Sequence, residues 1–284
     1  MKKLMLAFLV LMMVSGLVFA GGGREAGQAA PAQTGPQRHT ITVGGSTSVA
    51  PLMEIFKAEY ERLNSHITIT ISASGSGDGI RGAPAGTFEI GMSSRDLNPT
   101  EKGTDIQEFV VAIDAIAVIV NSNNPVSDLT LAQLNDIYTG AVTRWEQLGA
   151  AARGHTGPIA VVSRESGSGT RGAFEEIVRF QDRLVSGATE FASTGAVRAE
   201  VSRNVHAIGY ISLGSVDNSV KALNVDGVSA TTANVVAGTY RVARPFILLT
   251  RRSGVLNQNT RAFLDWALGN EGQTLVGRSW VRVN

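Results

Sequence analysis

The sequence predicts a globular α/β protein in which strands and helices alternate along the chain. Hydrophobic residues make up 43% of its 284 residues, which is enough apolar surface for a buried core. From residue 40 onward, short runs rich in β-branched side chains alternate with amphipathic stretches. The connections between these segments are mostly short. An alternation of this kind favours an α/β fold.

The first 20 residues have the features of a cleaved secretory signal peptide. Two lysines precede an apolar run, and Val18 and Ala20 place small or permissive side chains at the −3 and −1 positions of a cut after Ala20. A membrane anchor is the alternative, but the run contains Ser15 and Gly16 and falls short of the ~20 apolar residues that a span requires. We therefore expect residues 1–20 to be removed on export.

Residues 21–38 are rich in Gly, Ala, Pro and Gln and are expected to form a flexible linker. The chain contains no cysteine, which excludes disulfides, thiolate metal sites and a cysteine nucleophile, and also a lipid-modified cysteine at the new N-terminus. The exported protein is therefore expected to be periplasmic and not lipid-anchored.

The charge of the chain is almost balanced, with 25 Lys and Arg against 24 Asp and Glu and a formal net charge of +1. Binding to nucleic acid requires a clustered surplus of basic residues. We therefore expect no nucleic acid among the partners of this protein.

The expected elements follow one another from residue 40 to residue 268. Leu52, Phe56 and Tyr60 recur at helical spacing, which predicts a helix with one apolar face. The apolar run at 110–120 contains Asp114, so it is expected to be a buried strand and not a membrane span. In all, strands are expected at 40–43, 67–72, 110–120, 159–162, 207–212 and 246–250, and helices at 51–63, 131–138, 171–183 and 260–268.

Three segments share one design, in which a strand is followed by a loop dense in Gly, Ser and Thr and then by a helix start. They span residues 44–51, 72–81 and 163–171. Such loops place hydroxyls and free backbone N–H groups at the positive end of a helix dipole, which suits an oxyanion. A single loop of this kind is usually a helix cap. Three of them, with Arg164 beside the third to supply a planar guanidinium fork, indicate an anion-binding site.

The sequence matches none of the common templates for catalysis. It lacks the phosphate-binding loop motif of nucleotide enzymes, the H-E-x-x-H zinc motif and the G-x-S-x-G nucleophile elbow. Its four histidines, His39, His66, His155 and His206, are far apart in the sequence and suggest neither a general base nor a metal ligand. We therefore expect no enzymatic activity, no metal and no cofactor. A secreted phosphatase-like protein is the alternative that an activity assay must exclude.

The three loops resemble the ligand loops of a known family, the periplasmic phosphate-binding proteins of bacterial ABC phosphate importers. The resemblance rests on residues 45–52, on 75–80 followed by 86–95, and on 164–171. Residues 114–121, 131–145 and 207–212 resemble framework segments of the same family, so that the similarity covers nearly all of residues 40–284.

The resemblance implies a two-lobed periplasmic-binding-protein fold, type II-like, in which the chain crosses between the lobes twice and a central cleft holds the ligand. The first lobe is expected at 39–112 together with 244–284, and the second at 113–243. The resemblance also implies that the protein, as a monomer, binds inorganic phosphate with high affinity and delivers it to a membrane-embedded ABC permease. Another oxyanion, such as sulfate, molybdate or a phosphonate, is the alternative ligand.

The ligand contacts of the family carry over to a set of loop residues. Many relatives have Asp at the position of Glu89, where it accepts a proton of phosphate, and this implies the same role for Glu89 with a side chain longer by one methylene. Sulfate has no such proton at neutral pH, so an acceptor that faces the anion disfavours sulfate. Ser166 stands where relatives carry an acidic residue. The expected phosphate contacts are Ser46, Thr47, Ser48, Ser76, Glu89, Arg164, Ser166, Ser168, Gly169 and Thr170.

Overall fold

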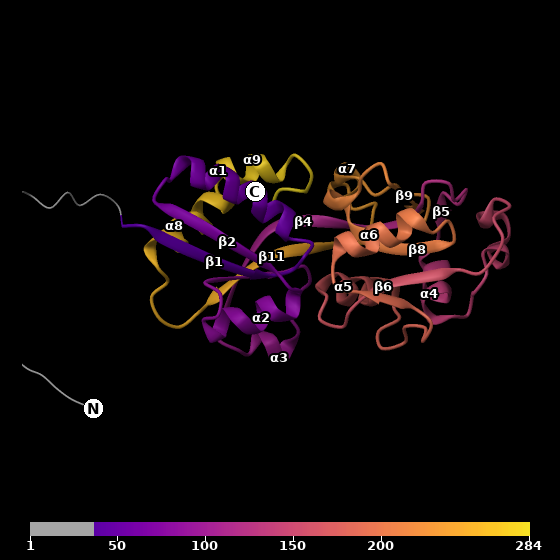
Figure 1. Cartoon of the computed structure of the whole chain (residues 1–284), viewed down its shortest axis with the longest axis horizontal. Helices are drawn as coiled ribbons and strands as arrows, with labels where there is room; N and C mark the ends of the chain where they lie inside the picture. Colours follow the sequence, from indigo (N-terminus) through magenta and orange to yellow (C-terminus); the bar gives the residue numbers. More distant parts are fainter. Residues whose placement is uncertain (1–36) are drawn as a thin grey trace, which may run out of the picture. The chain divides into compact units, whose positions relative to one another are not determined.

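A nine-stranded mixed sheet runs through the part of the chain that the computed structural model describes, residues 37–284 (Figure 1). The expected signal peptide and nearly all of the expected linker lie outside the described residues. The strands are arranged in the order β2-β1-β3-β11-β4-β8-β6-β7, with β9 paired to β4. Their bounds are β1 His39–Gly45, β2 Ile67–Ala73, β3 Ile90–Ser93, β4 Ile106–Asn121, β6 Ala160–Arg164, β7 Thr189–Phe191, β8 Ala207–Ser212, β9 Val220–Ala222 and β11 Ala243–Arg251. A second, two-stranded sheet joins β5 Asp128–Leu129 to β10 Asn224–Val225.

Helices lie between the strands. Their bounds are α1 Ala50–Leu63, α2 Ser76–Ala85, α3 Pro99–Lys102, α4 Leu131–Thr139, α5 Gly169–Val178, α6 Thr194–Arg203, α7 Thr232–Val236, α8 Gln258–Leu268 and α9 Asn270–Val276, with 3₁₀ helices at Trp145–Ala152 and Leu213–Ser215. The prediction of an α/β fold is confirmed, and each strand expected from the sequence is present. Within residues 37–284, none of the helices combines the length and the apolar character needed to span a membrane.

The two largest of three hydrophobic clusters divide this part of the chain into two lobes, and the third, smaller cluster packs α2 against β11 of the first lobe. The core of the first lobe contains Tyr60 and Phe263, whose rings meet edge to face at 5.0 Å. The core of the second lobe contains Phe174 and Tyr210, which stack at 4.1 Å. The first core draws on residues 41–112 and 246–280, and the second on residues 115–242. This distribution supports the expected lobe boundaries, which stay a prediction.

Strands β4 and β11 connect the two lobes. From Ile106 to Ala115, β4 pairs with β11 beside the core of the first lobe, and from Ile116 to Val120 it pairs with β8 beside the core of the second. Since β11 ends at Arg251 within the first lobe, the chain passes from one lobe to the other along β4 and returns along β11 (Figure 1). These two antiparallel strands are therefore the crossovers of the fold.

The helix expected at 171–183 has different ends in the structure. Helix α5 begins at Gly169 because the Ser168 side chain accepts a hydrogen bond from the backbone N–H of Arg171. It ends at Val178 because Arg179 adopts a left-handed conformation with φ 66°. Helices α2, α3, α6, α7 and α9 were not among the expected helices, although a helix start was expected at the loop of residues 72–81. The glycines of α2 conceal its helical character, since they lower helix propensity.

Candidate functional site

The carboxyl ends of three neighbouring strands of the first lobe carry serine side chains. Strands β2 and β3 run parallel to β1, so all three end at the same edge of the sheet. Ser46 follows β1, Ser76 begins the helix after β2, and Ser94 follows β3. The Ser46 hydroxyl donates to Ser94 Oγ at 2.9 Å, and Ser76 Oγ lies 3.2 Å from the same oxygen. The ends of β1 and β3 can approach this closely because residue 45 is a glycine with φ +130°. A Cβ at Gly45 would lie 2.4 Å from the carbonyl oxygen of Met92 in β3.

The second lobe brings two helix starts to the same place. Strands β6 and β7 are parallel and end at Arg164 and Phe191, and they are followed by α5 and α6. Thr170 lies in the first turn of α5, and Thr194 is the first residue of α6. Both threonines are buried. Their hydroxyls therefore lie at the positive ends of two helix dipoles.

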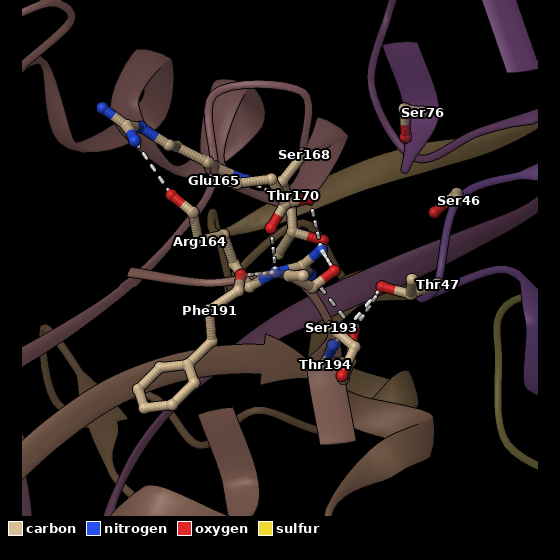
Figure 2. Close-up of polar contacts among 12 residues, drawn as sticks. Ser46, Thr47, Ser76, Arg164, Glu165, Ser168, Thr170, Phe191, Ser193 and Thr194 are labelled. Carbon is tan, nitrogen blue, oxygen red and sulfur yellow. Dashed lines mark hydrogen bonds and ion pairs between the residues drawn. The ribbon is translucent and has the colours of Figure 1, made fainter. Parts of the chain in front are cut away.

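Hydroxyls from the two lobes meet directly. Thr47 Oγ1 lies 3.3 Å from Thr194 Oγ1 (Figure 2). Ser48 Oγ lies 2.8 Å from Thr170 Oγ1 and 3.0 Å from Thr194 Oγ1. Ser48 is fully buried, so its two contacts are sealed from solvent, whereas Thr47 is partly exposed. We call the following set the interlobe hydroxyl cluster: Ser46, Thr47, Ser48, Ser76, Ser94, Thr170 and Thr194.

Arg164 brings a buried guanidinium to the interlobe hydroxyl cluster (Figure 2). Its Nε and Nη2 groups donate to the Glu165 carboxylate at 3.2 and 2.9 Å and to the carbonyl oxygens of Phe191 and Ala192, both at 3.0 Å. Only Nη1 is directed toward the cluster, where it donates to Thr194 Oγ1 at 3.3 Å. The acceptors on one side of the fork thus fix Arg164 so that Nη1 faces the hydroxyls.

The structure brings most of the expected contact residues together. Ser46, Thr47, Ser48, Ser76, Arg164 and Thr170 lie at the cluster through the hydrogen bonds given above. Gly169 lies against it, because a Cβ there would come within 2.3 Å of Ser76 Oγ. Ser168 is buried and caps α5, whereas Ser166 is exposed.

Glu89 does not reach the cluster, which corrects the expectation from the sequence. Its carboxylate accepts from Thr260 Oγ1 at 2.5 Å and lies 3.1 Å from His39 Nε2. The physical reason is its position in the chain. Glu89 directly precedes β3, whereas the cluster forms where β3 ends, about 13 Å further along the strand. Glu89 instead accepts a bond at the N-terminal turn of α8, and we leave it out of the proposed site.

Two residues of the cluster were missed from the sequence, Ser94 and Thr194. A signal for Thr194 exists, because Ser193-Thr194-Gly195 repeats the pattern of small hydroxyl residues before a helix. It was overlooked because β7, the strand before it, has only three residues. Ser94 lies in a stretch that resembles the ligand loops of the family, and only the pairing of β3 with β1 shows that it faces Ser46.

A buried ion pair lies where the crossover strands meet. Asp114 of β4 and Arg244 of β11 are register partners, and their side chains pair at 3.2 Å. Arg244 Nη1 also donates to the carbonyl oxygen of Ser94 at 2.9 Å, and Ser212 Oγ donates to Asp114 at 2.8 Å. Burial raises the pKa of Asp114 to about 6 despite the attraction of Arg244, and burial lowers the pKa of Arg244 to about 10. The ion pair therefore connects the crossovers to the cluster.

The arrangement of donors suits an anion. It combines neutral hydroxyl donors, two helix N-termini and one guanidinium in a buried place between two lobes. Within residues 37–284, no three His, Asp or Glu side chains are grouped so that they could hold a metal ion.

Known proteins are similar to this chain over most of its length. A family model described as a PBP superfamily domain matches residues 30–271. The phosphate-binding protein PstS of Bacillus subtilis is 30% identical over 85% of this chain and 82% of its own length, and PstS of Borreliella burgdorferi is 28% identical over 83% and 87%.

Solved structures give the same result. A crystal structure from Clostridium perfringens, of a protein assigned as a phosphate ABC transporter substrate-binding protein and with phosphate bound, is 42% identical over 87% of this chain and all of that one, with a TM-score of 0.83. An ABC-type phosphate transport receptor from Vibrio cholerae is 34% identical over 85% and 99%, with a TM-score of 0.70.

Proposed function

The chain belongs to the PBP superfamily and, within it, to the phosphate-binding proteins of ABC importers, and on this premise we propose how it works. It binds inorganic phosphate at the interlobe hydroxyl cluster and delivers it to a membrane-embedded ABC permease. It acts as a monomer in the periplasm after removal of residues 1–20, and it carries out no catalytic step.

The observation that carries this proposal is the direct contact of hydroxyls from two lobes beside one buried guanidinium. Ser48, Thr170 and Thr194 satisfy one another at 2.8 to 3.0 Å, so a phosphate oxygen can replace each neighbour without leaving a hydroxyl unpaired. Insertion of the anion requires the lobes to part slightly. The crossover strands β4 and β11 are the elements that can bend when this happens.

The hydrogen bonds of the cluster can supply affinity without several counter-charges. Neutral O–H and N–H dipoles that are held in a buried site replace the water around the anion. Arg164 contributes a full positive charge that is directed at the hydroxyls of the cluster. The first turns of α5 and α6 add backbone N–H groups that point toward the same place.

Recognition of the phosphate proton falls to the hydroxyls in this proposal. A hydroxyl oxygen accepts as well as donates, so a serine of the cluster can accept from a phosphate O–H. The carboxylates near the site are already engaged: Glu165 binds Arg164, and Asp114 binds Arg244 and Ser212. Glu89 therefore has no part in selectivity.

Closure of the lobes would create the surface that the permease reads. A backbone bond already joins the lobes in this structure, because the N–H of Gly77 in α2 donates to the carbonyl oxygen of Gly167 at 3.0 Å. Phosphate that holds the two halves together would stabilise this bond as well. The proposal is that the permease recognises this closed arrangement.

A second candidate ligand is another tetrahedral oxyanion, such as sulfate or molybdate. The placement of Glu89 favours it, because Glu89 binds Thr260 and His39. Within residues 37–284, the carboxylates of Glu165 and Asp114 near the hydroxyls are already paired with arginines. The relatives weigh against it, because the similar structure from Clostridium perfringens contains phosphate.

Calorimetric titration of the purified protein with phosphate, sulfate, molybdate and a phosphonate separates these readings. We expect phosphate to bind most tightly, with one anion per chain. Equal or tighter binding of sulfate would support the second candidate. Turnover of p-nitrophenyl phosphate would contradict the absence of catalysis.

A further inference from the structure

A basic groove lies at the end of β11 that is remote from the interlobe hydroxyl cluster. It is a cavity of about 270 Å³ between the ends of β4 and β11 and helix α8. Its lining includes Gln107, Phe109, Thr250, Arg251, Arg252 and Arg261. Arg251 is seven residues from Arg244 along an extended strand, so the groove lies about 23 Å from the ion pair beside the cluster.

The charges of this groove are not balanced. Arg251 Nε lies 3.3 Å from the Asp105 carboxylate, and Arg252 Nη2 donates to the carbonyl oxygen of Ile106 at 2.6 Å. The Arg261 guanidinium forms no ion pair or hydrogen bond with any residue of the described chain. The lining of the groove thus contains three arginines and no acidic residue, and Asp105 beside it pairs with Arg251 alone, which leaves a local surplus of positive charge. The contacts with Asp105 and Ile106 fix the orientation of the Arg251 and Arg252 guanidinium groups.

A buried hydroxyl adds a polar contact to the groove. Thr250 is 2% exposed, and its hydroxyl makes no hydrogen bond within residues 37–284. The hydroxyl oxygen nevertheless keeps some contact with solvent. Gln107 is its direct cross-strand partner, so both side chains lie on one face of the sheet. The Gln107 amide nitrogen donates to the carbonyl oxygen of Glu108 at 3.3 Å. The Thr250 hydroxyl is thus a free donor at the floor of a basic groove.

We propose that this groove is a second anion site, independent of the first, and that it binds a phosphoryl oxyanion. Guanidinium forks match the paired oxygens of such a group, and the unpartnered Thr250 hydroxyl supplies a further donor. The cavity is smaller than the ~300 Å³ at which pockets for drug-sized ligands begin, so it suits a small anionic group. That group can come from a free condensed phosphate or from the headgroup of an anionic phospholipid.

The first experiment records amide ¹⁵N–¹H shifts of the protein with saturating inorganic phosphate, so that the first site is filled, and titrates pyrophosphate. We expect saturable shifts at residues 107, 250–252 and 261. A variant with Arg252→Ser and Arg261→Ser should bind at least tenfold more weakly, and Thr250→Val should also weaken binding. Arg198→Ser is the matched control, because Arg198 is a surface arginine of the second lobe that pairs with Asp217 at 3.2 Å.

The second experiment distinguishes the two sources. Sedimentation with phosphatidylglycerol vesicles, compared with phosphatidylcholine vesicles, reports a lipid headgroup, whereas pyrophosphate shifts without sedimentation report a free anion. Either result, if lost in the double variant, supports the site. Absence of both, or persistence of both in the double variant, overturns it. Phosphate affinity at the first site should be unchanged in every variant, so failure of this proposal leaves the proposed transport function untouched.

Discussion

Replacement of Arg164 by alanine tests the assignment of the anion site to the interlobe hydroxyl cluster. The guanidinium is 1% exposed and directs only Nη1 at the hydroxyls, because the Glu165 carboxylate and two carbonyl oxygens occupy Nε and Nη2. One hydrogen bond to a charged group contributes about 1.5–3 kcal/mol. Loss of the Nη1 contact should therefore weaken phosphate binding by about 10- to 150-fold.

The assay is calorimetric titration with phosphate at pH 7. Arg164→Lys keeps the charge but cannot form the fork, so we expect a loss smaller than that of alanine. Arg81→Ala is the control, because Arg81 is an exposed arginine of α2 that pairs with Asp78 and makes no contact with the cluster hydroxyls. A melting curve for each variant shows that it is folded. If folded Arg164→Ala binds phosphate as tightly as the Arg81→Ala control, the reasoning about this site is wrong.

Three further predictions concern selectivity, packing and pH. Glu89→Gln should leave the ratio of phosphate affinity to sulfate affinity unchanged within about twofold. Its weaker bonds to Thr260 and His39 should lower the melting temperature. A large decrease in the affinity ratio would show that Glu89 belongs to the site. Gly79→Ala should destabilise the fold by about 3 kcal/mol in chemical denaturation, because its Cβ would lie 2.5 Å from the Met92 carbonyl oxygen, whereas Gly195→Ala, which has open space, should be tolerated. Burial raises the pKa of Asp114 from 3.8 to about 6, so between these values the native state keeps a proton that the unfolded chain has lost. The quantity to measure is the free energy of unfolding of the wild type minus that of Asp114→Asn. This difference should fall as the pH rises from 4 to 6, by at most about 1.4 kcal/mol per pH unit, and should level off above pH 7. A rise of the difference between pH 4 and 6 would contradict the raised pKa of Asp114.

The strands and the hydroxyl-rich loops could be predicted from the sequence because their signals are local. Runs of β-branched residues predicted β1, β2 and β8, and the small polar residues after them predicted Ser46 and Ser76 as neighbours of the site. The helix α2 could not be predicted in this way beyond the helix start expected at residues 72–81. Its Gly79 is required by contact with the backbone of β1 and β3, which no local pattern reveals.

The error at Glu89 has a different cause. A sequence shows that a carboxylate lies near a ligand loop, but it does not show at which end of a four-residue strand the side chain lies. Thr194 was missed for a related reason, since it joins the cluster only through the parallel pairing of β7 with β6. Which residues share an edge of the sheet is a property of strand order, and strand order is set by long-range packing.

The most direct test of the account is a crystal structure of this protein with phosphate. We predict one phosphate between the lobes, with its oxygens within hydrogen-bond distance of the hydroxyls of Ser48, Thr170 and Thr194 and of Nη1 of Arg164. Phosphate bound elsewhere, with the direct contacts between Ser48 and the two threonines intact, would contradict it.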